Sequence, residues 1–140
     1  MSDTFDLDRF TQAQAAVYDA VLGELRAARK RSHWMWFIFP QLAGLGRSAM
    51  AQRYALTSLD EARAYLAHPV LGERLRECVA LVLAAHDKSA HQIFGDPDDM
   101  KLHSSLTLFA QAAPAEQLFR DCLVKYFDGA SDPATLSLLT

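Results

Sequence analysis

Two stretches of the sequence concentrate polar side chains that could bind or transform a ligand. The later one, from Asp98 to Ser105, places a carboxylate, an ammonium group and two hydroxyls among apolar residues. At ~100° per residue, Asp98, Lys101 and Ser105 fall within ~60° of one another on a helix. Together with Ser104 they could line a pocket for an anionic or heavily hydroxylated ligand. The simpler alternative is an Asp98–Lys101 ion pair, with both serines hydrogen-bonded to the preceding turn.

The earlier stretch is rich in aromatic rings. Trp34 and Trp36 could stack on a base or a sugar ring, and Gln41, just past Pro40, could read the edge of such a ligand. Packing in the core is the ordinary role of tryptophan, and it remains the alternative for both residues. The residue types alone do not decide between the two roles.

A glycine loop follows these aromatic residues. Gly44, Gly46 and Ala49 match the letters of the dinucleotide-binding fingerprint, but that fingerprint requires a βαβ unit, and the surrounding helical pattern argues against one. A glycine loop that leads into a helix can bind a phosphate without such a fold, and Arg47 and Ser48 stand at this position. The alternative is a plain turn in which Ser48 caps the next helix.

The histidines are scattered along the chain. No pair has i, i+4 spacing and no cysteine pair accompanies them, so we expect no metal site, and we name no cofactor. His33 stands beside the tryptophans, where it could act as a general base or as a ligand contact. The alternative is a histidine that satisfies a buried polar group. His68, in front of Pro69, is a further candidate for a ligand contact.

The spacing of apolar residues predicts helices throughout the chain. Residues 15–30, 70–85 and 115–127 repeat apolar side chains as an amphipathic helix does. Ser58 followed by Glu61 is the pattern of a capping box. Residues 102–113 contain no Asp, Glu, Lys or Arg, which predicts a central helix. We therefore expect an all-α fold: a single compact domain over residues 1–140, with about eight helices, several of them short, around a buried aromatic segment.

The aromatic segment itself is compatible with two structures. A strand would be buried on both faces, but the rest of the chain offers almost no alternating segment that could pair with it. We therefore favour a buried helix over residues 32–39, capped by Ser32 and ended by Pro40.

The composition places the chain among globular proteins. Its 140 residues are 51% hydrophobic and 22% charged, which excludes a disordered chain. The net charge of −3 gives no case for a nucleic-acid partner. The basic residues between Arg26 and Arg31 are typical of the last turn of a helix, with phosphate binding as the alternative.

The compartment follows from what the sequence lacks. No apolar stretch approaches the ~20 residues that cross a bilayer, and the acidic N-terminus shows no signal-peptide pattern. Cys78 and Cys122 are isolated and fit reduced, buried thiols. We expect a cytoplasmic protein without a membrane partner, and these features do not define its oligomeric state.

A set of short motifs is spread over nearly the whole chain. They are His33-Trp34-Met35-Trp36-Phe37-Ile38-Phe39-Pro40-Gln41, Gly44-Leu45-Gly46, Tyr54-Ala55-Leu56, His68-Pro69-Val70-Leu71-Gly72, Ile93-Phe94-Gly95 and Ser104-Ser105-Leu106-Thr107-Leu108-Phe109. The combination resembles the domain-of-unknown-function 1810 family, most specifically in the first motif. The resemblance implies a small, mainly helical bacterial domain. It implies no activity and supplies no catalytic residues, so the candidate residues rest on their chemistry alone.

Two hypotheses of different kinds follow. In the first, the protein binds or processes a small phosphorylated ligand, nucleotide-like or sugar-phosphate-like: Lys101 and Arg47 meet its charge, and His33 is the candidate acid or base. If the protein is an enzyme, hydrolysis without a metal fits these residues best. In the second, the same residues form the core, and the surface binds a partner protein without catalysis. Convergence of His33, Gln41 and Lys101 on one solvent-reached pocket would favour the first.

Overall fold

A computed structural model describes residues 5–139 of the chain and confirms the predicted all-α fold. Over this range it contains ten helices and no strand. The helices are α1 (Asp8–Ala15), α2 (Tyr18–Arg26), α3 (Met35–Ile38), α4 (Ala49–Arg53), α5 (Leu59–Ala67), α6 (Leu71–Ala84), α7 (Ala90–Phe94), α8 (Asp98–Ala112), α9 (Gln117–Phe127) and α10 (Pro133–Leu139).

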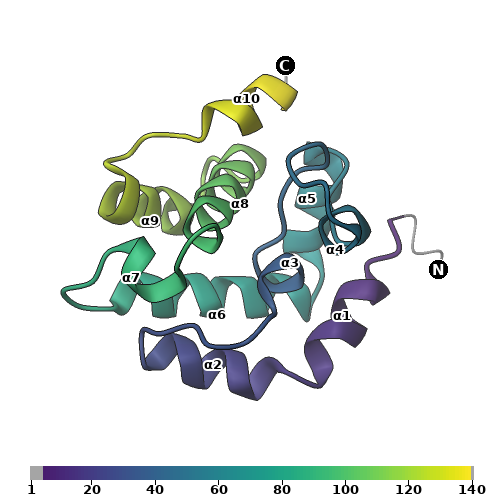
Figure 1. The fold of residues 1–140 in the computed structure, drawn as a ribbon. Coiled ribbons are helices and arrows are strands. Elements are labelled where there is room, and N and C mark those ends of the chain that lie inside the picture. The colour runs from purple at the N-terminus through teal and green to yellow at the C-terminus, as the bar shows by residue number, and fades with distance from the viewer. Residues whose placement is uncertain (1–4, 140) are drawn as a thin grey trace.

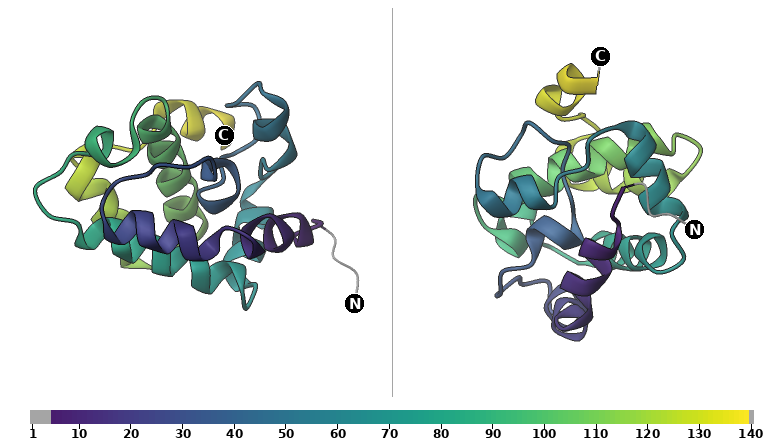
Figure 2. Two further views of the ribbon diagram at one scale, coloured as in Figure 1. Left: turned by 60° about the horizontal axis from the view of Figure 1, so that its bottom comes forward. Right: turned by 90° about the vertical axis from the view of Figure 1, so that its right-hand side faces the viewer.

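The helix α8 occupies the centre of this arrangement. It packs against α5, α7, α9 and α10, while α6 packs against α2, α5 and α9 (Figure 1). The absence of charged side chains over residues 102–113 explains this position, because a helix that is apolar around most of its circumference is stable only when other elements surround it. By contrast, α10 lies at the periphery of the molecule (Figure 2).

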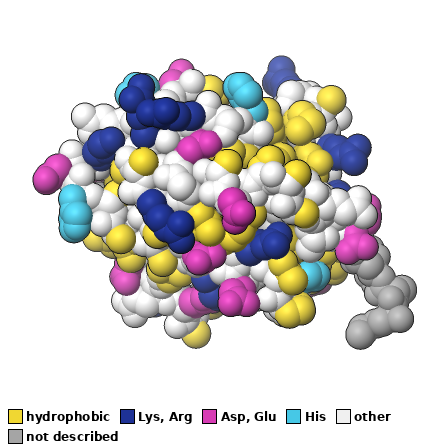
Figure 3. Space-filling view, turned by 90° about the horizontal axis from the view of Figure 1, so that it is seen from below, with side chains coloured by type: hydrophobic (Ala, Val, Ile, Leu, Met, Phe, Trp, Pro, Cys, Tyr) yellow, Lys and Arg dark blue, Asp and Glu magenta, His cyan; other side chains and the backbone are white. Residues whose placement is uncertain are grey.

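The surface of the molecule carries both charges. On the face seen in Figure 3, Lys and Arg side chains are interspersed with Asp, Glu and apolar side chains. No helix within residues 5–139 has the length and apolar character needed to cross a membrane.

The chain leaves α2 earlier than its apolar spacing predicts. The helix ends at Arg26, not at residue 30, and Ala28 adopts a left-handed conformation with φ of 54°. The carboxylate of Glu24 accepts hydrogen bonds from the backbone N–H groups of Arg31 at 2.6 Å and Ser32 at 3.0 Å. It also accepts the hydroxyl of Ser32, which therefore does not cap the next helix. The Glu24 side chain thus stabilises the turn by which the chain leaves the helix.

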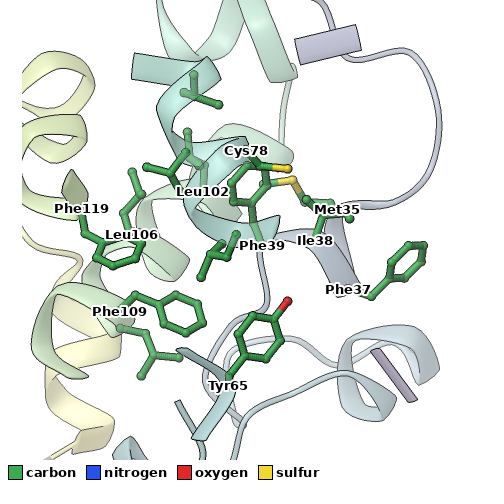
Figure 4. Packing of buried hydrophobic residues seen from close by; sticks show 14 of the residues in the cluster. Met35, Phe37, Ile38, Phe39, Tyr65, Cys78, Leu102, Leu106, Phe109 and Phe119 are labelled. Carbon is green, nitrogen blue, oxygen red and sulfur yellow. The ribbon is translucent and has the colours of Figure 1, made fainter. Parts of the chain in front are cut away.

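The aromatic segment is helical for one turn only. In place of the predicted helix over residues 32–39, α3 spans Met35–Ile38 and begins without a side-chain cap. Its burial agrees with the prediction, since Trp34 is only 1% exposed. Met35, Ile38 and Phe39 point into the core beside side chains of α6 and α8 (Figure 4).

At the start of α5 the predicted Ser58 cap is confirmed, but the Glu61 side chain does not bind the backbone of Ser58. Ser58 accepts a hydrogen bond from the N–H of Glu61 at 3.1 Å, as expected. The Glu61 carboxylate, however, accepts the N–H of Thr57 at 2.8 Å and pairs with Arg9 at 3.0 Å. Glu61 thereby connects α5 to α1 instead of completing a capping box.

Candidate ligand-binding site

A cavity of about 340 Å³ opens between three segments that are far apart in the sequence. They are the loop before α4, the N-terminal half of α8 and the segment that leads into α10. The residues that line it are Gln41, Leu45, Gly46, Pro97, Met100, Lys101, His103, Ser104, Asp132 and Ala134. Its volume lies at the lower end of the range of ~300–1,000 Å³ that is usual for small-molecule sites.

The backbone before α4 holds Gln41 at this cavity. Leu56, next to α5, donates its N–H to the carbonyl of Gln41 at 2.9 Å and accepts the N–H of Ala43 at 2.7 Å. These two bonds form a short parallel bridge that fixes the loop. Gly46 is also required there, because a Cβ atom on it would lie 2.4 Å from the Cβ of Ala51. The glycine therefore permits close packing of the loop on α4.

One wall of the cavity carries excess positive charge. The carboxylate of Asp98 lies 2.9 Å from the ammonium of Lys30 and 3.6 Å from that of Lys101. The side chain of Lys30 is 7% exposed, whereas that of Lys101 is 23% exposed and lines the cavity. One carboxylate compensates only one of two ammonium groups, so Lys101 is able to attract an anion. Its ammonium also lies 5.2 Å from the ring centroid of Trp36.

The segment before α10 contributes a carboxylate to the cavity. Asp132 Oδ2 accepts the hydroxyls of Ser104 at 2.7 Å and Thr135 at 2.6 Å, and the N–H of Thr135 at 3.3 Å. Burial alone would raise the pKa of Asp132, but these hydrogen bonds outweigh it and hold the pKa below its ordinary value. The N–H of Asp132 donates to the hydroxyl of Thr107 at 2.9 Å. Asp132 is therefore an ionised, positioned side chain.

His103 is the histidine at this cavity. Its Nε2 lies 2.7 Å from the carbonyl oxygen of Ala130, and its ring stacks on Phe127 with centroids 4.1 Å apart. A carbonyl oxygen only accepts, so Nε2 carries the proton of that bond. In the neutral ring Nδ1 is then the basic nitrogen. Acid–base chemistry at the cavity would therefore use Nδ1.

The sequence-predicted residues separate into two groups. Gln41, Lys101 and Ser104 line the cavity together, and Asp98 and Trp36 adjoin it through Lys101. The others lie elsewhere. Those residues are His33, Trp34, Arg47, Ser48, His68 and Ser105.

Three residues of the second group have structural partners. The indole N–H of Trp34 donates to Glu24 at 3.0 Å. Ser48 is exposed and caps α4, accepting the N–H of Ala51 at 3.1 Å. His68 caps the start of α6 through Nδ1, which accepts the N–H groups of Val70 at 3.1 Å and Leu71 at 3.2 Å. These contacts match the structural alternatives that the sequence left open.

The three remaining residues are either exposed or fully buried, and none of them lines the cavity. His33 and Arg47 are exposed and do not line the cavity. Ser105 is fully buried, and its hydroxyl has no hydrogen-bond partner within residues 5–139. The sequence analysis placed Asp98, Lys101 and Ser105 on one face of this helix. On α8, Ser105 lies ~100° from Ser104, and the cavity meets the face that carries Ser104.

Comparison with known proteins agrees with the motifs. The sequence profile of the family described as "Protein of unknown function (DUF1810)" matches residues 4–139. The chain belongs to the DUF1810 family. A crystal structure of the conserved hypothetical protein Rv1873 from Mycobacterium tuberculosis has the same fold, with a TM-score of 0.97, 57% sequence identity and coverage of 98% of both chains. No curated protein matches the chain.

The cavity of this DUF1810 protein contains two residues that the sequence analysis did not single out. Asp132 and His103 are separated by 29 positions and meet only because the segment before α10 folds back on α8. One signal was present: His103 stands between Lys101 and Ser104 and thus on the same stretch of helix. Asp132 had none, because no local pattern links it to α8.

Potential metal ligands and the two thiols of this DUF1810 protein are placed as follows. The part of the chain between residues 5 and 139 has no cluster of three or more His, Cys, Asp or Glu that could hold a metal ion. Cys78 and Cys122 are buried, and burial raises the pKa of both thiols to about 12. Neither thiol is therefore an activated nucleophile.

Proposed function

We propose that the cavity beside α8 binds a small, polar metabolite that carries a phosphate group. The main support is that two of the three residues expected to converge, Gln41 and Lys101, lie on the walls of one cavity, whereas the third, His33, does not. Gln41 can donate and accept hydrogen bonds, and Lys101 supplies positive charge that Asp98 does not fully compensate. A polar anion fits both.

The lining supports a sugar phosphate over a nucleotide. No Trp, Phe or Tyr is among the ten lining residues, and one face of the His103 ring is already stacked on Phe127, so the cavity offers no large aromatic face on which a base could stack. Trp36 adjoins the site only behind Lys101, and Trp34 is in the core. The volume of about 340 Å³ also suits a single phosphorylated sugar.

Turnover would use a different histidine from the predicted one. His33 is exposed and is not a lining residue, so it does not supply an acid or base to this cavity. His103 takes that position in our proposal, with Nδ1 as the basic nitrogen of the neutral ring. Hydrolysis without a metal remains the reaction class that we propose if the protein is an enzyme.

The proposal extends to the setting in which the protein works. We infer a cytoplasmic protein without a nucleic-acid partner, and the net charge of −3 supports the second part. The alternative of a protein-interaction module has less support. The large exposed apolar side chains of the protein belong to different segments, so the sequence does not group them into one docking surface. They are Met50, Val70, Met100, Val124 and Leu138.

Calorimetric titration with phosphorylated metabolites tests the proposal. We expect a ligand whose affinity for Lys101→Ala is at least about tenfold weaker than for the wild type, a loss of ~1.4 kcal/mol. Lys88→Ala removes the same charge from an exposed lysine outside the cavity, and it should bind as the wild type does. Equal affinity of all three proteins for every ligand that binds would reject the site.

A further inference from the structure

The two carboxylate oxygens of Asp132 have different surroundings. Oδ2 accepts all three hydrogen bonds that the carboxylate receives, from Ser104 and Thr135. Oδ1 receives none from residues 5–139. The single buried side-chain oxygen or nitrogen without a partner in that range is Ser105 Oγ, so Oδ1 is open to solvent. Asp132 lines the cavity, so its anchored carboxylate leaves one oxygen available to a bound ligand.

Lys101 and Asp132 give the lining of the cavity two side chains of opposite charge. Lys101 can attract an anion, because Lys30 and Lys101 share the single carboxylate of Asp98. The ionised carboxylate of Asp132 only accepts hydrogen bonds, so it repels a phosphate and favours a hydrogen-bond donor. A ligand that satisfies both residues must carry an anionic group and, apart from it, a donor.

The geometry points to Asp132 as a specificity-determining residue that accepts a hydrogen bond from a ligand hydroxyl. This inference rests on the proposed function, and it narrows the ligand to a phosphorylated sugar, as distinct from phosphate alone or a phosphate ester without hydroxyls. Three protein donors on Oδ2 fix the direction of Oδ1 before a ligand arrives. Such prior positioning lowers the entropy cost of binding and sharpens selection.

Binding in this way would also connect two segments of the fold. Lys101 belongs to α8, whereas Asp132 precedes α10 and follows a turn in which Asp128 and Gly129 have φ of 55° and 79°. A ligand held by both residues bridges α8 and the C-terminal segment. Hydrogen exchange of residues 130–139 should therefore slow when the ligand binds.

The test compares ligands that differ only in their hydroxyl groups. We would titrate the full chain with inorganic phosphate, cyclohexyl phosphate, glucose 6-phosphate, fructose 6-phosphate and ribose 5-phosphate. We expect at least one sugar phosphate to bind about tenfold or more tightly than inorganic phosphate and cyclohexyl phosphate. Cyclohexyl phosphate is the decisive comparison because it has a ring and a phosphate but no hydroxyl.

Asp132→Asn supplies the second half of the test. Its amide can satisfy Ser104 and Thr135 through the oxygen, and it then turns a donor toward the cavity. We expect the preference for sugar phosphates to disappear while affinity for inorganic phosphate stays or rises. Asp128→Asn is the matched control. Asp128 is exposed, and its backbone has a left-handed conformation that asparagine also adopts.

Each outcome separates this inference from the function on which it rests. If sugar phosphates bind in a Lys101-dependent manner and Asp132→Asn retains the preference, Asp132 does not determine specificity, while the phosphate site stands. Equal affinity of the wild type for cyclohexyl phosphate and the sugar phosphates overturns the inference even if Asp132→Asn does not fold. If none of the probes binds to the wild type, both the phosphate site and the inference are rejected.

Discussion

The hydroxyl of Ser104 donates a hydrogen bond of 2.7 Å to Asp132 Oδ2, and this bond joins the central helix α8 to the segment that begins α10. Two further contacts support the junction: Thr107 accepts the N–H of Asp132, and His103 donates to the carbonyl of Ala130. Three side chains on adjacent turns of α8 therefore hold the peripheral C-terminal segment, and the same contacts shape one wall of the cavity.

Ser104→Ala should destabilise the protein and loosen its C-terminal segment. A hydrogen bond to a charged acceptor contributes ~1.5–3 kcal/mol, and we expect the lower part of that range because Asp132 is only half-buried. Chemical denaturation would measure the loss, and hydrogen exchange should be faster in residues 130–139 than in the wild type. Unchanged exchange there would mean that Ser104 does not hold the segment.

Ser105→Ala should have the opposite effect on stability. The Ser105 hydroxyl is fully buried without a partner, so it lost its hydration on folding and gained no hydrogen bond in return. Alanine also has the higher helix propensity. We expect the free energy of unfolding to rise by ~1 kcal/mol in a urea titration. A decrease would show that the hydroxyl has a partner in solution.

Acid should weaken the Asp132 junction. The folded-state pKa of Asp132 lies below its ordinary value of 3.8, so its hydrogen bonds stabilise the protein fully above that value. The contribution is lost as pH falls through the lower, folded-state pKa. The wild type should exceed Asp132→Asn in unfolding free energy at pH ~6, and the difference should shrink toward pH ~3. A pH-independent difference would contradict this assignment.

Glu24 is expected to matter more for stability than a surface carboxylate usually does. Burial would raise its pKa, but hydrogen bonds from Ser32, from the backbone of Arg31 and Ser32, and from Trp34 lower the pKa to about 2. Glu24→Ala leaves the buried indole N–H of Trp34 without its acceptor, and we expect a loss of ~2 kcal/mol by chemical denaturation. Glu24→Gln keeps an acceptor oxygen and should lose less.

The control for Glu24 is a carboxylate without such contacts. Asp121 is exposed on α9, and Asp121→Ala should change the free energy of unfolding by no more than ~0.5 kcal/mol. Equal effects of Glu24→Ala and Asp121→Ala would mean that the hydrogen bonds at Glu24 contribute no more than a solvated charge.

Gly46→Ala should disturb the cavity wall. The added Cβ would lie 2.4 Å from the Cβ of Ala51, so the loop or α4 must shift, at a cost of ~1–3 kcal/mol. Gly23→Ala is the matched control: its Cβ meets no atom within 4 Å, and alanine in the middle of α2 should stabilise the protein by ~0.5–1 kcal/mol. Thermal unfolding should show a lower melting temperature for Gly46→Ala and a higher one for Gly23→Ala. A stabilising Gly46→Ala would refute the packing argument.

Local patterns along the chain were sufficient for much of the fold. The uncharged run over residues 102–113 predicted a central helix, and α8 is that helix. Ser58 predicted the start of α5, because a capping side chain binds only a backbone N–H in the first turn of its own helix. Burial of the aromatic segment followed from its composition, and family membership from its motifs.

Contacts that helical periodicity and capping patterns do not encode decided the rest. Glu24 ends α2 by binding the backbone at Arg31 and Ser32, a contact that helical periodicity cannot reveal. The face of α8 that meets the cavity depends on how its neighbours rotate it, and Asp132 reaches Ser104 across 28 positions. The sequence by itself determined the all-α class, the central helix α8, the Ser58 cap and the burial of the aromatic segment, because these depend on residues within a few turns. Only the tertiary structure decided the site, because its walls come from three separate segments that packing alone brings together.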